Sequence, residues 1–165
     1  MTTQSFNTAQ MWALLICFVS GALLTGALYF EFIRGLAPCP LCMMQRVWFA
    51  LAAITAYVSL LHKPRLGIYP LVSLVCASTG GYFSIRQLWL QSLPEEQVPA
   101  CGPDMQYMLD VFPLGDVLVA MTQGTGDCAK TAWSFIGVTL PGWALVGFIV
   151  LAVLATLQLK TGLKR

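Results

Sequence analysis

The chain has 165 residues, of which 58% are hydrophobic and only 10% are charged, with a formal net charge of +2 and a mean hydropathy of +0.74. Soluble globular domains carry about 25% charged residues. The composition therefore excludes an ordinary soluble domain and indicates an integral membrane protein in contact with the lipid bilayer.

Four hydrophobic stretches are each long enough to cross a membrane. A hydrocarbon core roughly 30 Å thick takes about 20 helical residues at 1.5 Å each. We predict an all-α membrane protein of one domain, 1–165: a four-transmembrane-helix bundle whose long outer loop contains short surface helices. The spans are about 11–30, 43–61, 66–90 and 142–159, and the outer connections are about 31–42 and 91–141.

Basic residues predict the orientation of the bundle. Lys63 and Arg65 lie between the second and third spans, and three further basic residues follow the fourth span. The positive-inside rule places these segments, and with them both termini, in the cytoplasm. The connection 91–141, with six acidic residues against a single lysine, then faces outward.

A Cys-x-x-Cys pair, Cys39 and Cys42, lies between the first two spans. Pro38 and Pro40 bias the residues before them towards extended geometry, so the second helix is expected to begin at Leu41 or Cys42. A helix N-terminus stabilises a thiolate through its unpaired N–H groups and its dipole. The pattern predicts a redox-active pair, with Cys39 in the loop and open to another thiol.

The connection 91–141 carries a second pair, Cys101 and Cys128. Prolines and glycines give Cys101 an irregular, exposed setting. Pro113 divides two apolar faces that predict a short helix or helix pair, either lying on the membrane surface or packed as a cap over the bundle. Asp127 is the predicted N-cap of a further short helix that begins near Cys128.

The cysteines also indicate the compartment. Four of the six fall in the outer connections, and Cys17 and Cys76 fall inside spans, where small apolar packing is expected. No cysteine falls on the cytoplasmic side, which fits an oxidising outer compartment such as a bacterial periplasm. Redox-active disulfides are favoured over static structural ones and over zinc. A zinc site would need four closed ligands, and the sequence offers no second Cys-x-x-Cys.

Arg46 lies about four residues inside the second span, where a charge is tolerated only if it snorkels or finds a partner. It follows Cys42 by four positions, on the same helix face. Gln87 lies at a similar depth in the third span, so donors from two helices are expected to converge near Cys42. A quinone has two carbonyl acceptors and dissolves in lipid, and this layer suits its head group. Glu31 and Arg34 are predicted to form a separate interfacial pair.

Several motifs spread over nearly the whole chain together resemble the DsbB family, the quinone-dependent disulfide bond formation proteins of bacterial inner membranes. They are Pro38-Cys39-Pro40-Leu41-Cys42 with Gln45-Arg46, Arg86-Gln87-x-Trp89-Leu90-Gln91, Cys101, Gly126-Asp127-Cys128 and Pro141-Gly142-Trp143. The resemblance implies a multi-pass inner-membrane enzyme that reoxidises a periplasmic DsbA-like dithiol protein and passes the electrons to ubiquinone or menaquinone. It implies no metal and no nucleic-acid partner.

The resemblance also implies roles for the cysteines. Cys101 would form the mixed disulfide with the DsbA-like protein, and Cys128 would be the disulfide partner of Cys101. Cys39 would exchange with this outer pair, and Cys42 would face the quinone.

Arg46 would support the Cys42 thiolate and bind the quinone, and Gln87 is a candidate quinone ligand where some family members have a histidine. Two other classes compete with this interpretation. One is a quinone reductase of the vitamin K epoxide reductase type. The other is a tetraspanin-like scaffold, which would keep its disulfides within the large loop rather than beside a membrane-embedded arginine.

The orientation gives a first testable prediction. Cysteines 39, 42, 101 and 128 should all face the periplasm, and Lys63 should face the cytoplasm, because of the distribution of lysine and arginine. A membrane-impermeant maleimide applied to intact cells should label single cysteines retained at position 101 but not ones engineered at position 63. Protection of position 101 would overturn the scheme.

Overall fold

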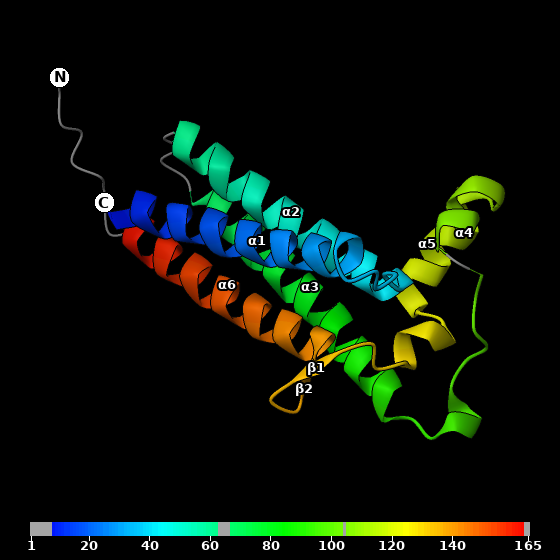
Figure 1. Cartoon of the computed structure of the whole chain (residues 1–165). Coiled ribbons are helices and arrows are strands. Elements are labelled where there is room, and N and C mark those ends of the chain that lie inside the picture. Colours follow the sequence, from blue (N-terminus) through cyan, green and yellow to red (C-terminus); the bar gives the residue numbers. More distant parts are fainter. Residues whose placement is uncertain (1–7, 63–66, 104, 164–165) are drawn as a thin grey trace.

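The computed structural model describes residues 8–62, 67–103 and 105–163. Across these residues, four long helices lie side by side (Figure 1). They are α1 (Thr8–Phe32), α2 (Pro40–Leu61), α3 (Ile68–Ser92) and α6 (Leu140–Leu163). Each is long and apolar enough to cross a membrane. The predicted all-α, four-helix membrane architecture is confirmed.

The basic residues behind the predicted orientation are only partly described. Lys160 lies in the last turn of α6. Lys63, Arg65, Lys164 and Arg165 lie outside the described residues, as does residue 66, where the third span is expected to begin.

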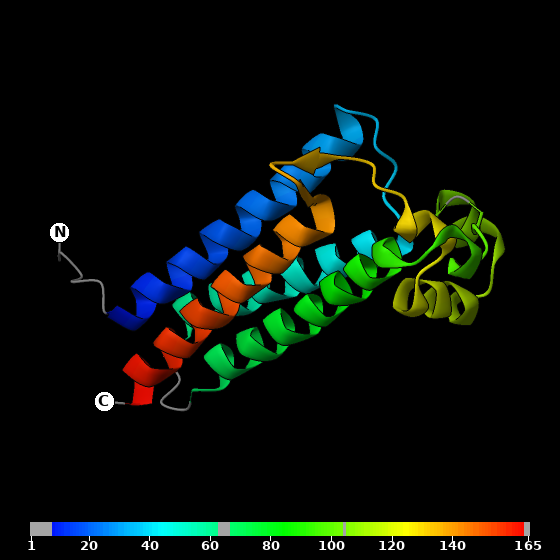
Figure 2. The same ribbon diagram turned by 90° about the horizontal axis from the view of Figure 1, so that it is seen from below.

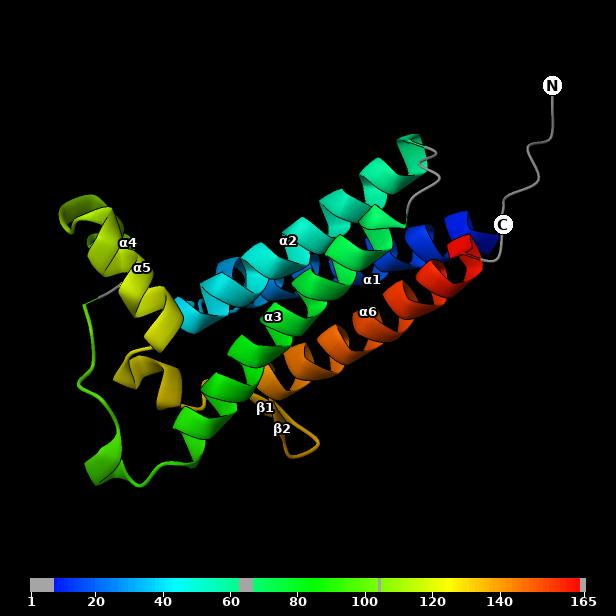
Figure 3. The same cartoon turned by 180° about the vertical axis from the view of Figure 1, so that it is seen from behind.

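Each long helix packs on two neighbours, so that α1 and α3 both pack against α2 and α6. Figure 3 shows α3 running between those two helices. In the core, the rings of Phe49 and Phe148 stack across the bundle with centroids 3.9 Å apart. Gly80 of α3 makes room for this stack, since a Cβ there would lie 2.1 Å from the Phe148 ring. The aromatic stack and the small residue beside it hold the bundle together by close packing.

The other described elements gather at one end of the bundle, which we term the cysteine end. In Figure 2 a hairpin lies over the ends of α1 and α6, while α4 and α5 lie beyond the ends of α2 and α3. These elements are η1 (Glu95–Gln97), α4 (Met105–Val111), α5 (Leu114–Gln123), η2 (Gly126–Ala129), β1 (Ser134–Phe135) and β2 (Val138–Thr139).

The predicted pair of short helices is present, divided at Pro113 as expected. One face of the pair is a cap, because Met105, Met108 and Val117 are buried against Met43 at the start of α2. The opposite face remains apolar and exposed. Its exposed side chains are Tyr107, Leu109, Val111, Phe112, Leu114, Leu118 and Val119. The expected packing as a cap is therefore present, and a position of the exposed apolar face on the membrane surface stays a prediction.

Two expected helix starts are wrong. Helix α2 begins at Pro40, slightly before the predicted Leu41 or Cys42, because proline at the first helical position loses no intrahelical hydrogen bond. Asp127 is not an N-cap: it lies inside η2, whose first flanking residue is Thr125. Lys130 draws the Asp127 carboxylate away, with Nζ 2.8 Å from Oδ1.

Candidate functional site

The start of α2 positions the Cys-x-x-Cys pair. Cys39 is the N-cap residue in extended geometry, and its Sγ accepts a hydrogen bond from the Cys42 backbone N–H at 3.4 Å. The two Sγ atoms lie 2.8 Å apart, and both cysteines are free of a disulfide bond. A disulfide bond is about 2.05 Å long, so a small movement would close the ring.

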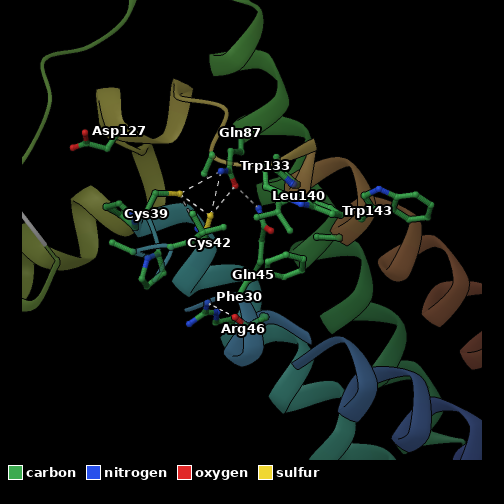
Figure 4. Close-up of a pocket in the computed structure, with 18 of the residues that line it drawn as sticks. Phe30, Cys39, Cys42, Gln45, Arg46, Gln87, Asp127, Trp133, Leu140 and Trp143 are labelled. Atoms are coloured by element: carbon green, nitrogen blue, oxygen red, sulfur yellow. Dashed lines mark hydrogen bonds between the residues drawn. The ribbon is translucent and has the colours of Figure 1, made fainter. Parts of the chain in front are cut away.

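Gln87 of α3 reaches across to both sulfurs (Figure 4). Its Nε2 lies 3.3 Å from Cys39 Sγ and 3.2 Å from Cys42 Sγ. Its Oε1 accepts a hydrogen bond from Gln45 Nε2 at 2.8 Å. The structure thus brings Gln87 to the pair, as its depth in the third span predicted. Gln45 was missed, although it lies on the same helix face as Cys42, three positions later.

Arg46 has hydrogen-bonding partners within the helix bundle. Its Nη1 forms an ion pair with the Glu31 carboxylate of α1, and its Nη2 donates to the Ala27 carbonyl at 3.1 Å. The predicted pairing of Glu31 with Arg34 is wrong. Helix α1 ends at Phe32, so Arg34 lies beyond the helix and does not share a face with Glu31. The charge of Arg46 is neutralised by a carboxylate.

A cavity of about 800 Å³ opens beside these residues. Its polar groups include Cys42, Gln45, Arg46 and Gln87, and its walls are mostly apolar. The walls contributed by α1 and α6 include Leu23, Gly26, Phe30, Leu140 and Ala144. A mostly apolar cavity of this size with a few convergent polar groups is typical of a site for a small organic molecule.

Aromatic rings line the rim of this cavity. Trp133 packs on Phe30 with centroids 4.8 Å apart and stacks on Phe135, which in turn lies 6.3 Å from Trp143. The hairpin holds Phe135 in this run through a turn with positive φ at Ile136 and Gly137. Positive φ at both central residues is typical of a tight two-residue hairpin turn.

Cys128 lies against the other side of Cys39. It is fully buried and packs in one cluster with Cys39, Leu41 and Leu90. The hydrogen bond that it accepts from the Cys39 thiol lowers the pKa of Cys128 to about 6. The same hydrogen bond, with a further one to Cys42 and burial, raises the pKa of Cys39.

Cys101 is exposed, unlike the other three. Its loop is fixed to η2, because the Gly126 N–H donates to the Ala100 carbonyl at 3.1 Å. A Cβ on Gly126 would lie 2.3 Å from the Pro99 carbonyl oxygen, so only glycine permits this approach. Asp127 lies nearby, and its carboxyl pKa is held below its usual range by Lys130 first and by hydrogen bonds from Cys101 and Gly102.

The structure therefore brings together the sulfurs of Cys39, Cys42 and Cys128 and the Gln87 amide, and it places Arg46 in the adjoining cavity. Among the described residues, no group of three or more metal-binding side chains lies close enough to hold a metal ion.

A four-helix membrane bundle that gathers free cysteines at one end defines a membrane-embedded thiol–disulfide oxidoreductase. The model of the family "Disulfide bond formation protein DsbB" matches residues 9–158. The chain belongs to this DsbB family, and its role is in disulfide bond formation.

Relatives described as "Disulfide bond formation protein B" match over most of their length. The protein of Hahella chejuensis is 46% identical over 138 residues, covering 81% of this chain and 84% of the relative. That of Methylococcus capsulatus is 45% identical over 161 residues and covers 96% of both chains. That of Marinobacter nauticus is 48% identical over 143 residues and covers 85% of both chains. No solved structure gives a significant match.

The contact between Cys39 and Cys128 predicts the pH range in which the Cys128 thiol loses its proton. In the fully reduced protein, Cys128 should form a thiolate as the pH rises through about 6 and should be protonated below that pH. Cys39→Ala removes the donor and should move the midpoint up towards the ordinary cysteine value of about 8.5. Cys39→Ser, which keeps a donor, should move it less.

The measurement is the ultraviolet absorbance of the thiolate, taken as a difference against a Cys128→Ser variant. An unchanged midpoint in Cys39→Ala would show that Cys39 does not act on Cys128.

Proposed function

We propose that the protein is a disulfide oxidase of the bacterial inner membrane that reoxidises a periplasmic DsbA-like dithiol protein and transfers the electrons to a membrane quinone. The observation that carries the proposal is the position of Cys39, whose Sγ lies 2.8 Å from Cys42 Sγ and which packs in one cluster with the buried Cys128. Sulfur atoms thus lead from the exposed connection to the membrane cavity.

The first exchanges follow from this order. With Cys101–Cys128 and Cys39–Cys42 as disulfides, a thiolate of the partner attacks Cys101 Sγ, and Cys128 leaves as a thiolate. A thiol of low pKa leaves readily. The Cys128 thiolate then attacks Cys39 Sγ, a Cys39–Cys128 disulfide forms, and Cys42 Sγ leaves with the electron pair.

The later exchanges restore the enzyme. The second thiol of the partner attacks the mixed disulfide and releases Cys101 as a thiolate with the oxidised partner. Cys101 then attacks Cys128, which re-forms the outer disulfide and frees Cys39. The Cys39 and Cys42 thiolates finally give up two electrons to the acceptor and close again as a disulfide, and the two protons released by the partner's thiols go to the acceptor.

A quinone supplies the chemistry that this last step needs, since it takes up two electrons and two protons. The residues fit such a group. Cys42, Gln45 and Arg46 gather at one side of the cavity, and aromatic and aliphatic walls suit a ring and an isoprenoid chain. The guanidinium has five N–H donors, and Glu31 and Ala27 engage only part of them.

The acceptor must be strongly oxidising. A DsbA-type protein has a potential of about −120 mV, so a glutathione-like acceptor at about −200 mV or below would not reoxidise it, whereas a respiratory quinone would. The same proposal places the cysteine end in the periplasm and both termini in the cytoplasm, in line with the distribution of basic residues.

The experiment that tests the proposal separates the two cysteine pairs. Cys101→Ser should abolish oxidation of a DsbA-like dithiol protein, because Cys101 is the exposed cysteine that a soluble partner can reach. It should leave the Cys39–Cys42 pair oxidisable by quinone. Rates of partner oxidation and of quinone reduction by a small dithiol, measured on the purified protein, report the two activities. Partner oxidation at the wild-type rate would make the outer pair structural.

Arg46 gives a second test. Arg46→Lys keeps the charge but loses the planar fork of donors, and should lower quinone reduction by about 10-fold. Arg46→Met should lower it by about 100-fold, the upper range for loss of hydrogen bonds to a charged group. The double variant Arg46→Met with Glu31→Gln controls for the carboxylate left without a partner. Recovery of activity in the double variant, or an unimpaired Arg46→Met, would remove Arg46 from the site.

A further inference from the structure

Two buried glutamines lie beside the reacting sulfurs. Gln45 is 5% exposed and Gln87 is 3% exposed, although both lie in helices that are apolar enough to span a membrane. Burial of an amide is unfavourable unless its donors and acceptors are satisfied. Their partners are each other and the sulfurs of Cys39 and Cys42.

We infer that Gln87 is a catalytic residue whose carboxamide stabilises the Cys42 thiolate, and that Gln45 is the positioning residue that fixes the direction of this amide. The inference rests on the proposed function and deepens it. It assigns Gln87 to the disulfide exchange, rather than to the binding of a quinone.

The contact with Gln45 favours the arrangement in which the NH₂ group of Gln87 is the end closer to the sulfurs. A carboxamide has one oxygen acceptor and an NH₂ group with two donors. Gln45 Nε2 donates to Gln87 Oε1 at 2.8 Å. This oxygen also lies 3.6 Å from Cys42 Sγ, but the NH₂ group of Gln87 lies closer to that sulfur, at 3.2 Å, and contacts Cys39 as well. If the Gln87 amide alone were flipped, its NH₂ group would face the NH₂ group of Gln45 and this hydrogen bond would be lost.

The geometry divides the two donors of Gln87 between the two sulfurs. Nε2 lies 3.2 Å from Cys42 Sγ and 3.3 Å from Cys39 Sγ, and both contacts are drawn in Figure 4. A neutral amide suits both states of the pair. It donates to a thiolate when one forms and needs no counter-ion when the pair is a disulfide.

The exchange creates a charge at this place. When the Cys128 thiolate attacks Cys39 Sγ, the Cys39–Cys42 bond breaks and its electron pair remains on Cys42 Sγ. No proton moves in this step, so a thiolate on the half-buried Cys42 must be stabilised by donors already in place. The hydrogen bonds of Arg46 go to Glu31, Ala27 and Met43 and not to Cys42, whereas Gln87 Nε2 lies 3.2 Å from Cys42 Sγ.

Replacement of Gln87 by leucine tests the inference. The reduced state contains the thiolate, so Gln87→Leu should make the Cys39–Cys42 disulfide harder to reduce. The equilibrium constant with glutathione should fall about 10- to 100-fold, the usual range for a hydrogen bond to a charged group. This corresponds to about 30 to 60 mV for a two-electron couple. The KM for a short-chain quinone should not change.

Two further variants sharpen the test. Gln45→Leu leaves Gln87 in place but free to flip, and should lower the same constant by a smaller factor. Gln158→Leu is the matched control, since Gln158 is a buried glutamine of α6 that bonds to Ser59 at the opposite end of the bundle. It should leave the constant unchanged.

An equilibrium constant unchanged by Gln87→Leu, or a raised KM for quinone with an unchanged constant, would overturn the inference. If Gln87→Leu does not fold, an unchanged constant in Gln45→Leu overturns it equally. The measurement uses the full chain and glutathione, without partner or quinone. A failure of the inference about Gln87 is therefore distinct from a failure of the proposed function, which the Cys101→Ser variant tests.

Discussion

The position of the Cys39 sulfur is the constraint on which the site depends. An N-cap residue has extended geometry and faces the free N–H groups of the first turn. Pro40 is the first residue of α2, so the extended N-cap position falls on Cys39. From there the sulfur reaches both Cys42, one turn into the helix, and Cys128, on a segment about 90 residues later. A helix start shifted by one residue would turn Cys39 away from both.

Two pairs of polar side chains at the cysteine end satisfy each other within the protein. Arg46 is paired with Glu31 across α1 and α2, and Gln87 with Gln45 across α2 and α3. These contacts cross the helix interfaces and therefore also hold the three helices in register around the cavity. A buried charge without a partner costs several kcal/mol, so a pre-paired arginine allows a polar site at membrane depth. Deeper in the bundle, close packing around Phe49 and Phe148 replaces these contacts.

Features set by local pattern could be predicted from the sequence. Hydrophobic length located the four helices, because a span must satisfy its own backbone hydrogen bonds over a fixed thickness. The Cys-x-x-Cys spacing located a site at the start of α2. Contacts between distant segments could not be predicted in this way. The spacing of Glu31 and Arg34 favours a pair between these two neighbours, yet Glu31 pairs with Arg46. The approach of Cys128 to Cys39 depends on how the connection 91–141 folds back. The role of Gln45 depends in the same way on Gln87 of another helix.

The charge balance of the site explains why an amide, rather than a second arginine, contacts the sulfurs. With Arg46 and Glu31 paired, the cavity wall gains no net charge while the cysteines are a disulfide. A free cation beside the pair would favour the thiolate strongly and would also lower its nucleophilicity, since reactivity falls with thiol pKa. An amide gives weaker stabilisation, shared by Cys39 and Cys42. In the proposed mechanism, this balance lets the pair be reduced from one side and reoxidised from the other without becoming trapped in either state.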